Sequence, residues 1–143
     1  MLVSDIMKQS VVSITPNAPV SSAARLLKQY NVGSLPVCSP DGTLRGVVTD
    51  RDIVTRCIAA EENPQEMPVK EIMTRAVQSI APHEDLRLAA QRMADKRIRR
   101  LPVTDPGGKL RGILSLGDIA KARNMSMEAA AALSEISQNI KQT

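Results

Sequence analysis

The sequence contains an internal repeat, and this repeat constrains the fold more than any other feature. A shift of 66 positions places residues 3–56 on residues 69–122 without a gap. About a third of the paired residues are identical, in blocks such as LPV at 35–37 and 101–103. A gapless duplication of this length predicts two equivalent units of roughly 55 residues each.

Each copy predicts the same order of secondary structure. In the first copy, the β-branched run VVSIT at 11–15 predicts a strand, and apolar residues at helical spacing predict a helix over 20–30. The runs SLPVC and LRGVVT flank the turn PDG, so they predict a hairpin, and a second helix is expected to begin near Thr49. The predicted fold class is therefore mixed α/β (α+β), with two β-α-β-β-α repeats.

The repeat also predicts the domain boundaries. The first repeat is expected over 1–60, a polar linker with prolines over 61–68, the second repeat over 69–123 and a helical tail over 124–143. Because one unit alone would leave a sheet face exposed, we expect the two to pack face to face with pseudo-two-fold symmetry, creating two equivalent clefts. The tail carries an apolar stripe that is expected to pack on the body or on a partner subunit: Met127, Ala130, Ala131, Leu133, Ile136 and Ile140.

Composition narrows the classes of partner. The apolar residues are aliphatic and Tyr30 is the single aromatic residue, so the chain offers almost no surface on which nucleic-acid bases stack. The net charge of +4 and the run KRIRR at 96–100 favour anionic partners, so weak nucleic-acid binding stays a third alternative. The amino terminus does not resemble a signal peptide and no apolar run is long enough to cross a bilayer, so we expect a cytoplasmic protein without a membrane partner.

Catalysis is not expected from this sequence. The one histidine, His83, follows a proline at a predicted strand end, and no nucleophile comes with an evident base. Cys38 and Cys57 have no metal-ligand spacing and form no disulfide framework. We therefore predict no catalytic residues and no metal site.

The repeated stretches GVVTDRDI at 46–53 and GILSLGDI at 112–119 allow two interpretations. A hydroxyl residue followed three positions later by an acid, as in Thr49 with Asp52, is the capping-box pattern of a helix start. The same geometry presents a hydroxyl, free N–H groups and a carboxylate to a phosphorylated sugar. The sequence alone leaves both interpretations open.

The blocks DIM, GSLPV, GVVTDRDI, RIRRLPV and GILSLGDI resemble tandem cystathionine-β-synthase (CBS) domains, the regulatory pair called a Bateman module, from residue 3 to about residue 123. The resemblance implies a homodimeric energy or metabolite sensor that binds AMP, ADP or ATP, with NAD or S-adenosylmethionine as other possible ligands. Because the repeats fill the chain, its signal is expected to pass to a separate effector protein. The alternative is a dimeric interaction module with degenerate clefts and no ligand.

The resemblance also implies the binding residues. The ribose and phosphate are expected to contact Thr49, Asp52, Ser115, Asp118, Arg51, Arg99 and Arg100. The adenine is expected to lie against Ile14, Thr15, Pro16, Leu35, Pro36, Ile80, Ala81, Ile98 and Pro102, with Gly46 and Gly112 leaving room for it. Related sensors place basic residues before LPV on the phosphate held by the opposite repeat. Arg99 and Arg100 are thus expected to serve the site of Thr49, while the site of Ser115 binds phosphate more weakly.

Overall fold

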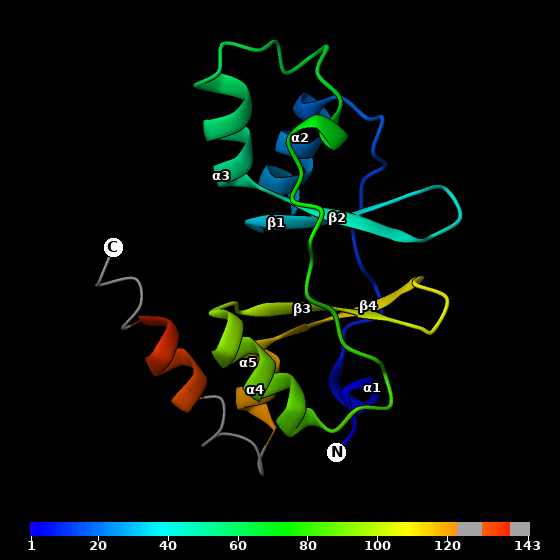
Figure 1. The fold of residues 1–143 in the computed structure, drawn as a ribbon, viewed down its shortest axis with the longest axis vertical. Helices are drawn as coiled ribbons and strands as arrows, with labels where there is room; N and C mark the ends of the chain where they lie inside the picture. The colour runs from blue at the N-terminus through cyan, green and yellow to red at the C-terminus, as the bar shows by residue number, and fades with distance from the viewer. Residues whose placement is uncertain (123–129, 138–143) are drawn as a thin grey trace. The chain divides into compact units, whose positions relative to one another are not determined.

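The computed structural model describes residues 1–122 and 130–137, and the chain forms two compact units (Figure 1). The central unit comprises Val12–Val77. The terminal unit comprises Met1–Val11 together with the described residues from Gln78 onward. Each unit combines helices with one two-stranded antiparallel sheet, which confirms the predicted mixed α/β class.

The central unit is built around the hairpin of β1 and β2. Leu35 of β1 lies opposite Val48 of β2, and Gly42 in the turn adopts a positive φ of 91°. Side chains from α2 and the following helical segments pack with the hairpin in one hydrophobic core. The elements in order are α2 (Val20–Tyr30), β1 (Ser34–Cys38), β2 (Leu44–Thr49), α3 (Asp50–Asp52), the π-helical η1 (Ile53–Ile58) and the 3-10 helix η2 (Val69–Glu71).

The terminal unit repeats this plan. Leu101 of β3 lies opposite Leu114 of β4, and Gly108 occupies the matching turn with a positive φ of 83°. Its elements are α1 (Val3–Ile6), α4 (Leu86–Lys96), β3 (Arg100–Thr104), β4 (Leu110–Ser115) and α5 (Leu116–Lys121), and residues 130–137 are also helical. None of the helices in the described ranges has the length and apolar character of a membrane span.

The predicted first strand of each copy is reduced to one bridging residue. Ile14 pairs in parallel with Val37, donating its N–H to the Pro36 carbonyl at 3.1 Å and accepting the Cys38 N–H at 2.9 Å. The next hydrogen bonds of a parallel ladder need N–H groups from Pro36 on one side and Pro16 on the other, and proline has none. The prediction of a full strand was therefore wrong. The second copy behaves in the same way, since its bridge between Ile80 and Val103 is flanked by Pro82 and Pro102.

The boundaries of the compact units differ from those of the sequence repeats, because the first segment of each repeat belongs to the other unit. Val3 of α1 is fully buried in the core of the terminal unit, which otherwise holds the second repeat. Val69 of η2, its counterpart at the shift of 66, is fully buried in the core of the central unit. Each repeat therefore supplies its first segment to the unit that holds the remainder of the other repeat.

The described part of the tail packs on the terminal unit. Ile136 is buried in its core, as the predicted stripe requires, and Ala132 is buried beside it. Ala130, Ala131 and Leu133 are exposed and do not pack on the body, so packing of these three residues on a partner subunit stays a prediction. Met127 and Ile140 lie outside the described residues.

Candidate functional site

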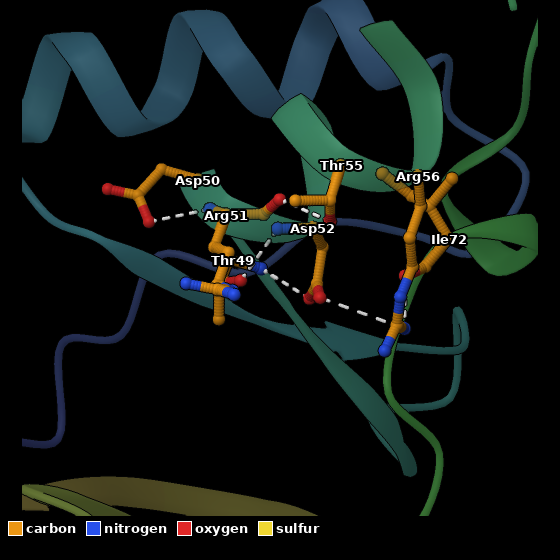
Figure 2. Close-up of polar contacts among 7 residues, drawn as sticks. All are labelled: Thr49, Asp50, Arg51, Asp52, Thr55, Arg56 and Ile72. Atoms are coloured by element: carbon orange, nitrogen blue, oxygen red, sulfur yellow. Dashed lines mark hydrogen bonds and ion pairs between the residues drawn. The ribbon is translucent and has the colours of Figure 1, made fainter. Parts of the chain in front are cut away.

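The junction between β2 and α3 holds the first repeated motif, and it forms a complete capping box (Figure 2). The Asp52 backbone N–H donates to Thr49 Oγ1 at 3.0 Å, and the Thr49 backbone N–H donates to Asp52 Oδ2 at 3.0 Å. Asp52 is 7% exposed. The capping interpretation is therefore confirmed for Thr49 and Asp52, and it occupies one of the two carboxylate oxygens.

The second oxygen of Asp52 faces a cation. Arg56 Nη1 lies 3.7 Å from Asp52 Oδ1 and also donates to the Ile72 carbonyl at 3.0 Å. Figure 2 shows the Arg56 guanidinium beside Ile72, with a dashed line joining it to the Asp52 carboxylate. Arg56 is not among the binding residues predicted from the sequence. Its position four residues after Asp52 on a predicted helix is the spacing at which opposite charges meet, so a local signal was present.

The junction between β4 and α5 has the same capping geometry with a different cation. The Asp118 backbone N–H donates to Ser115 Oγ at 3.0 Å, and the Ser115 N–H donates to Asp118 Oδ2 at 3.3 Å. Asp118 is 9% exposed, and its Oδ1 lies 3.8 Å from Lys8 Nζ. Lys8 belongs to the amino-terminal segment, 110 residues before Asp118 in the sequence (118 − 8), so no local spacing pointed to it.

The predicted phosphate-binding arginines lie beside the junctions of their own units. Arg100 lies opposite Ser115 in the hairpin register, and the Arg99 carbonyl accepts the Leu116 N–H at 2.8 Å. Both arginines are exposed, and so is Arg51 in α3. The expectation that Arg99 and Arg100 serve the junction of Thr49 relates two different units, and it stays a prediction.

The two junctions differ in the residues between the hydroxyl and the acid. The first carries exposed Asp50 and Arg51, and the Arg51 backbone N–H donates to Asp50 Oδ1 at 2.8 Å. The second carries Leu116, which is 5% exposed, and Gly117. The sequence analysis gave Asp50 no role, yet its carboxylate adds negative charge beside the first junction.

The predicted adenine-binding residues fall into two groups by exposure. Ile14, Leu35 and Ile80 are core residues of their own units, and Pro36 and Pro102 are also buried. The remaining members keep accessible surface: Thr15, Pro16, Ala81 and Ile98. Adenine binding by this set stays a prediction, and the accessible members are the ones with side-chain surface to offer.

The chain's own backbone accounts for Gly46 and Gly112. A Cβ atom at Gly46 would lie 2.5 Å from the Thr74 carbonyl oxygen and 3.0 Å from Met73 Sδ. A Cβ atom at Gly112 would meet the Lys8 carbonyl oxygen at 2.8 Å and the Met7 sulfur at 2.9 Å. The close approach that requires glycine is therefore the exchanged first segment, where the sequence analysis had expected an adenine.

The described residues offer no clustered metal ligands. Among them, no group of three His, Cys, Asp or Glu side chains comes close enough to hold a metal ion. The two junctions present hydroxyl, carboxylate and cationic groups, which suit a polar organic ligand with hydroxyl and anionic groups.

Comparison with known proteins places this geometry in a family. The CBS-domain family model matches residues 3–58 and 69–124. The CBS domain-containing protein YhcV of Bacillus subtilis is 42% identical over 139 residues, which cover 96% of this chain and 97% of that protein. The matched ranges coincide closely with the two copies of the internal repeat.

Solved structures of two related proteins share the fold and carry adenosine compounds. CBSX2 in complex with AMP is 30% identical, with a TM-score of 0.76 over 88% of this chain and 98% of that chain. The CBS domain pair of protein MJ0100, in complex with 5′-methylthioadenosine and S-adenosyl-L-methionine, is 29% identical, with a TM-score of 0.73 over 85% of this chain and 94% of that chain. These ligands share an adenosine group.

Proposed function

The chain belongs to the CBS-domain family, and from that premise we propose that it is a regulatory module that binds an adenosine nucleotide at its two strand-to-helix junctions. AMP, ADP and ATP are the proposed ligands, with S-adenosylmethionine and NAD as the next candidates. The module is proposed to act as a homodimer and to signal to a separate protein. Relatives with this fold are held in complex with AMP or with S-adenosylmethionine, which supports the ligand class.

One observation carries the proposal: each junction holds a buried aspartate with one oxygen committed to the protein and the other directed at a cation. Asp52 Oδ2 accepts the Thr49 N–H, while the one partner of Oδ1 among the described residues is Arg56, in a long ion pair at 3.7 Å. A ribose presents two neighbouring hydroxyl donors, and a carboxylate oxygen accepts both. Because the cap already fixes the carboxylate, little conformational freedom is lost when the ribose binds.

The rest of the nucleotide is assigned by chemistry. The exposed guanidinium groups of Arg51, Arg99 and Arg100 are proposed to contact phosphate, since arginine matches the geometry of phosphate oxygens. Tyr30 is the single aromatic residue, so each adenine is proposed to lie against aliphatic side chains and backbone, near Thr15 and Pro16 in the central unit or near Ala81 and Ile98 in the terminal unit.

Isothermal titration calorimetry with AMP tests the proposal on the full chain. We expect Asp52→Asn and Asp118→Asn each to remove or weaken one binding event, because the amide keeps an acceptor for the cap and loses the charge that a ribose hydroxyl binds. Asp95→Asn on α4 is the matched control, because it removes an exposed carboxylate whose hydrogen-bond partner is Gln91 on the same helix and not a residue of either junction. Equal binding by all three variants would contradict the assignment of the aspartates.

Thermal unfolding separates this function from that of a ligand-free interaction module. A ligand at a hundred times its dissociation constant stabilises the folded state by about 2.7 kcal/mol. AMP, ATP, NAD and S-adenosylmethionine are each added in turn, and the ligand released from purified protein is identified by mass spectrometry. If none of them raises the melting temperature and no ligand is released, the interaction module is the better description.

A further inference from the structure

Lys8 occupies a position in the second junction that the function described so far does not use. Its backbone is fixed by a two-way bridge to Ile113 of β4, with the Lys8 N–H donating at 2.9 Å and the Lys8 carbonyl accepting at 3.0 Å. Because Gly112 has no Cβ atom, the backbone of Lys8 can lie close to β4. Ile113 precedes Ser115 by two residues, so the backbone of Lys8 is held beside the capped aspartate.

The side chain of Lys8 is largely exposed, whereas its backbone is held by the bridge to Ile113. Its ammonium lies 3.8 Å from Asp118 Oδ1, and the side chain is 71% exposed, against 10% for that of Asp118. Among the described residues its charged group has this one partner. At the first junction, Arg56 is 51% exposed and is also anchored to the Ile72 carbonyl. The two aspartates therefore face cations that differ in exposure and in their hydrogen bonds to the protein.

This difference has a consequence for any ligand that donates hydroxyl groups to Asp118. A ribose that binds Oδ1 takes the place of the ammonium as its partner, and the lysine must then turn to another anion or to water. The phosphate of a bound nucleotide is such an anion, and the flexible four-carbon stem of lysine lets the charge follow it. A neutral nucleoside offers no replacement for the lost ion pair.

We propose that Lys8 is a ligand-contacting residue of the Ser115–Asp118 junction and that it makes this junction select an anionic nucleotide over the neutral nucleoside. The inference rests on the proposed function and adds to it a residue from the amino-terminal segment. It also revises the expectation of a weak phosphate site at Ser115, because this junction has a cation within its own unit.

The test compares AMP with adenosine by calorimetry in an Asp52→Asn background, which leaves the Asp118 junction as the site measured. We expect Lys8→Met to weaken AMP binding about tenfold, about 1.4 kcal/mol, and to change adenosine binding less than about twofold. Lys8→Arg is expected to retain most of the preference for AMP. The matched control is Lys28→Met on α2, which removes an exposed lysine from the other unit and is expected to change neither affinity.

The outcomes separate the inference from the function on which it rests. If AMP binds and Lys8→Met leaves its preference over adenosine unchanged, or weakens both ligands equally, Lys8 only neutralises Asp118 and the inference is wrong. If the Asp52→Asn protein binds neither ligand while the unsubstituted protein binds AMP, the inference fails and the proposed function holds for the first junction alone. If the unsubstituted protein binds neither ligand, the proposed function fails as well.

A second test uses NMR on the unsubstituted protein and therefore does not depend on the folding of a variant. In the unsubstituted protein with 13C-labelled lysine, the Cε signal of Lys8 is expected to move on addition of AMP and to move much less with adenosine. Equal responses to the two ligands, or no response to AMP, would contradict a contact between Lys8 and phosphate.

Discussion

Replacement of Gly46 by alanine tests whether β2 needs a glycine where the first segment of the second repeat, with Met73 and Thr74, packs against it. The new Cβ atom would lie 2.5 Å from the Thr74 carbonyl oxygen, and real Cβ atoms keep at least 3.0 Å, so the two backbones must separate by about 0.5 Å or more. The same carbonyl accepts the Val47 N–H at 3.0 Å, and the Thr74 N–H donates to the Val47 carbonyl at 2.9 Å. The separation therefore acts directly on two backbone hydrogen bonds.

The expected loss of stability follows from these contacts. Weakening two backbone hydrogen bonds costs about 1 kcal/mol each, and forcing an extra carbon into a packed contact costs about 1–3 kcal/mol. Alanine recovers about 0.5–1 kcal/mol because glycine loses more backbone freedom on folding. The net loss is about 2–4 kcal/mol, a large part of the 5–15 kcal/mol that is typical of a folded domain.

Urea unfolding of the ligand-free protein, followed by circular dichroism, measures this loss. With a slope of about 2 kcal/mol per molar urea, the midpoint is expected to fall by about 1–2 M. Gly33→Ala is the control in the same unit, because its Cβ atom would meet only Asp50 Oδ2 at 3.6 Å, and we expect a change within about 0.5 kcal/mol. If Gly46→Ala unfolds like Gly33→Ala and loses only ligand affinity, the glycine serves a ligand and the packing argument is wrong.

Three further predictions concern the cores and the titratable groups. Val3→Ala is expected to cost about 1–3 kcal/mol and to speed amide exchange in β3 and β4 while leaving β1 and β2 protected, because Val3 is buried in the terminal unit. Burial raises the pKa of the Cys38 and Cys57 thiols, so iodoacetamide at pH 8 is expected to label them slowly until urea is added, and rapid labelling of the folded protein would refute this. The Lys109 backbone N–H, with help from Arg111, holds the pKa of Asp105 below 3.8. The contribution of this carboxylate to the free energy of unfolding is therefore present above that pH and is lost as the pH falls through the lowered pKa. In urea unfolding, the stability difference between the unsubstituted protein and Asp105→Asn is expected to shrink below pH 3.8.

The sequence predicted the elements that depend on local pattern. The helix expected over 20–30 is α2 with the same bounds, because its apolar spacing is local and selects the buried residues Val20, Ala23 and Leu27. The hairpins were predicted by the turn sequences for the same reason, with glycine at the position of positive φ. The capping boxes were also visible, since their partners are three residues apart.

The features that the sequence did not predict depend on which segments meet in space. The first strands were expected from β-branched residues, but their length is decided by the missing N–H groups of Pro16 and Pro36, which matter only once the pairing partner is known. The repeat in the sequence does not predict that each first segment packs in the unit formed by the other repeat. Val3 and Val69 are identical residues at equivalent positions of the repeat, so the sequence similarity does not decide which core each one joins. Lys8 was not predicted as a site residue because its partner Asp118 is far away in the sequence.

The capping and ligand-binding interpretations of the repeated motif use different atoms of the same carboxylate. In Asp52, Oδ2 is bound to the Thr49 N–H and Oδ1 is left to a cation. A surface helix needs the first contact and gains little from an arginine beside the second oxygen, because a solvent-exposed ion pair contributes about 0–1 kcal/mol. A binding site benefits from both contacts: the cap holds the carboxylate in one orientation, and the cation keeps the unused oxygen from being buried unpaired until a ligand donor arrives. The cap is therefore the device that positions the proposed ribose acceptor, and the residue that faces Oδ1, Arg56 at one junction and Lys8 at the other, is where the two sites differ.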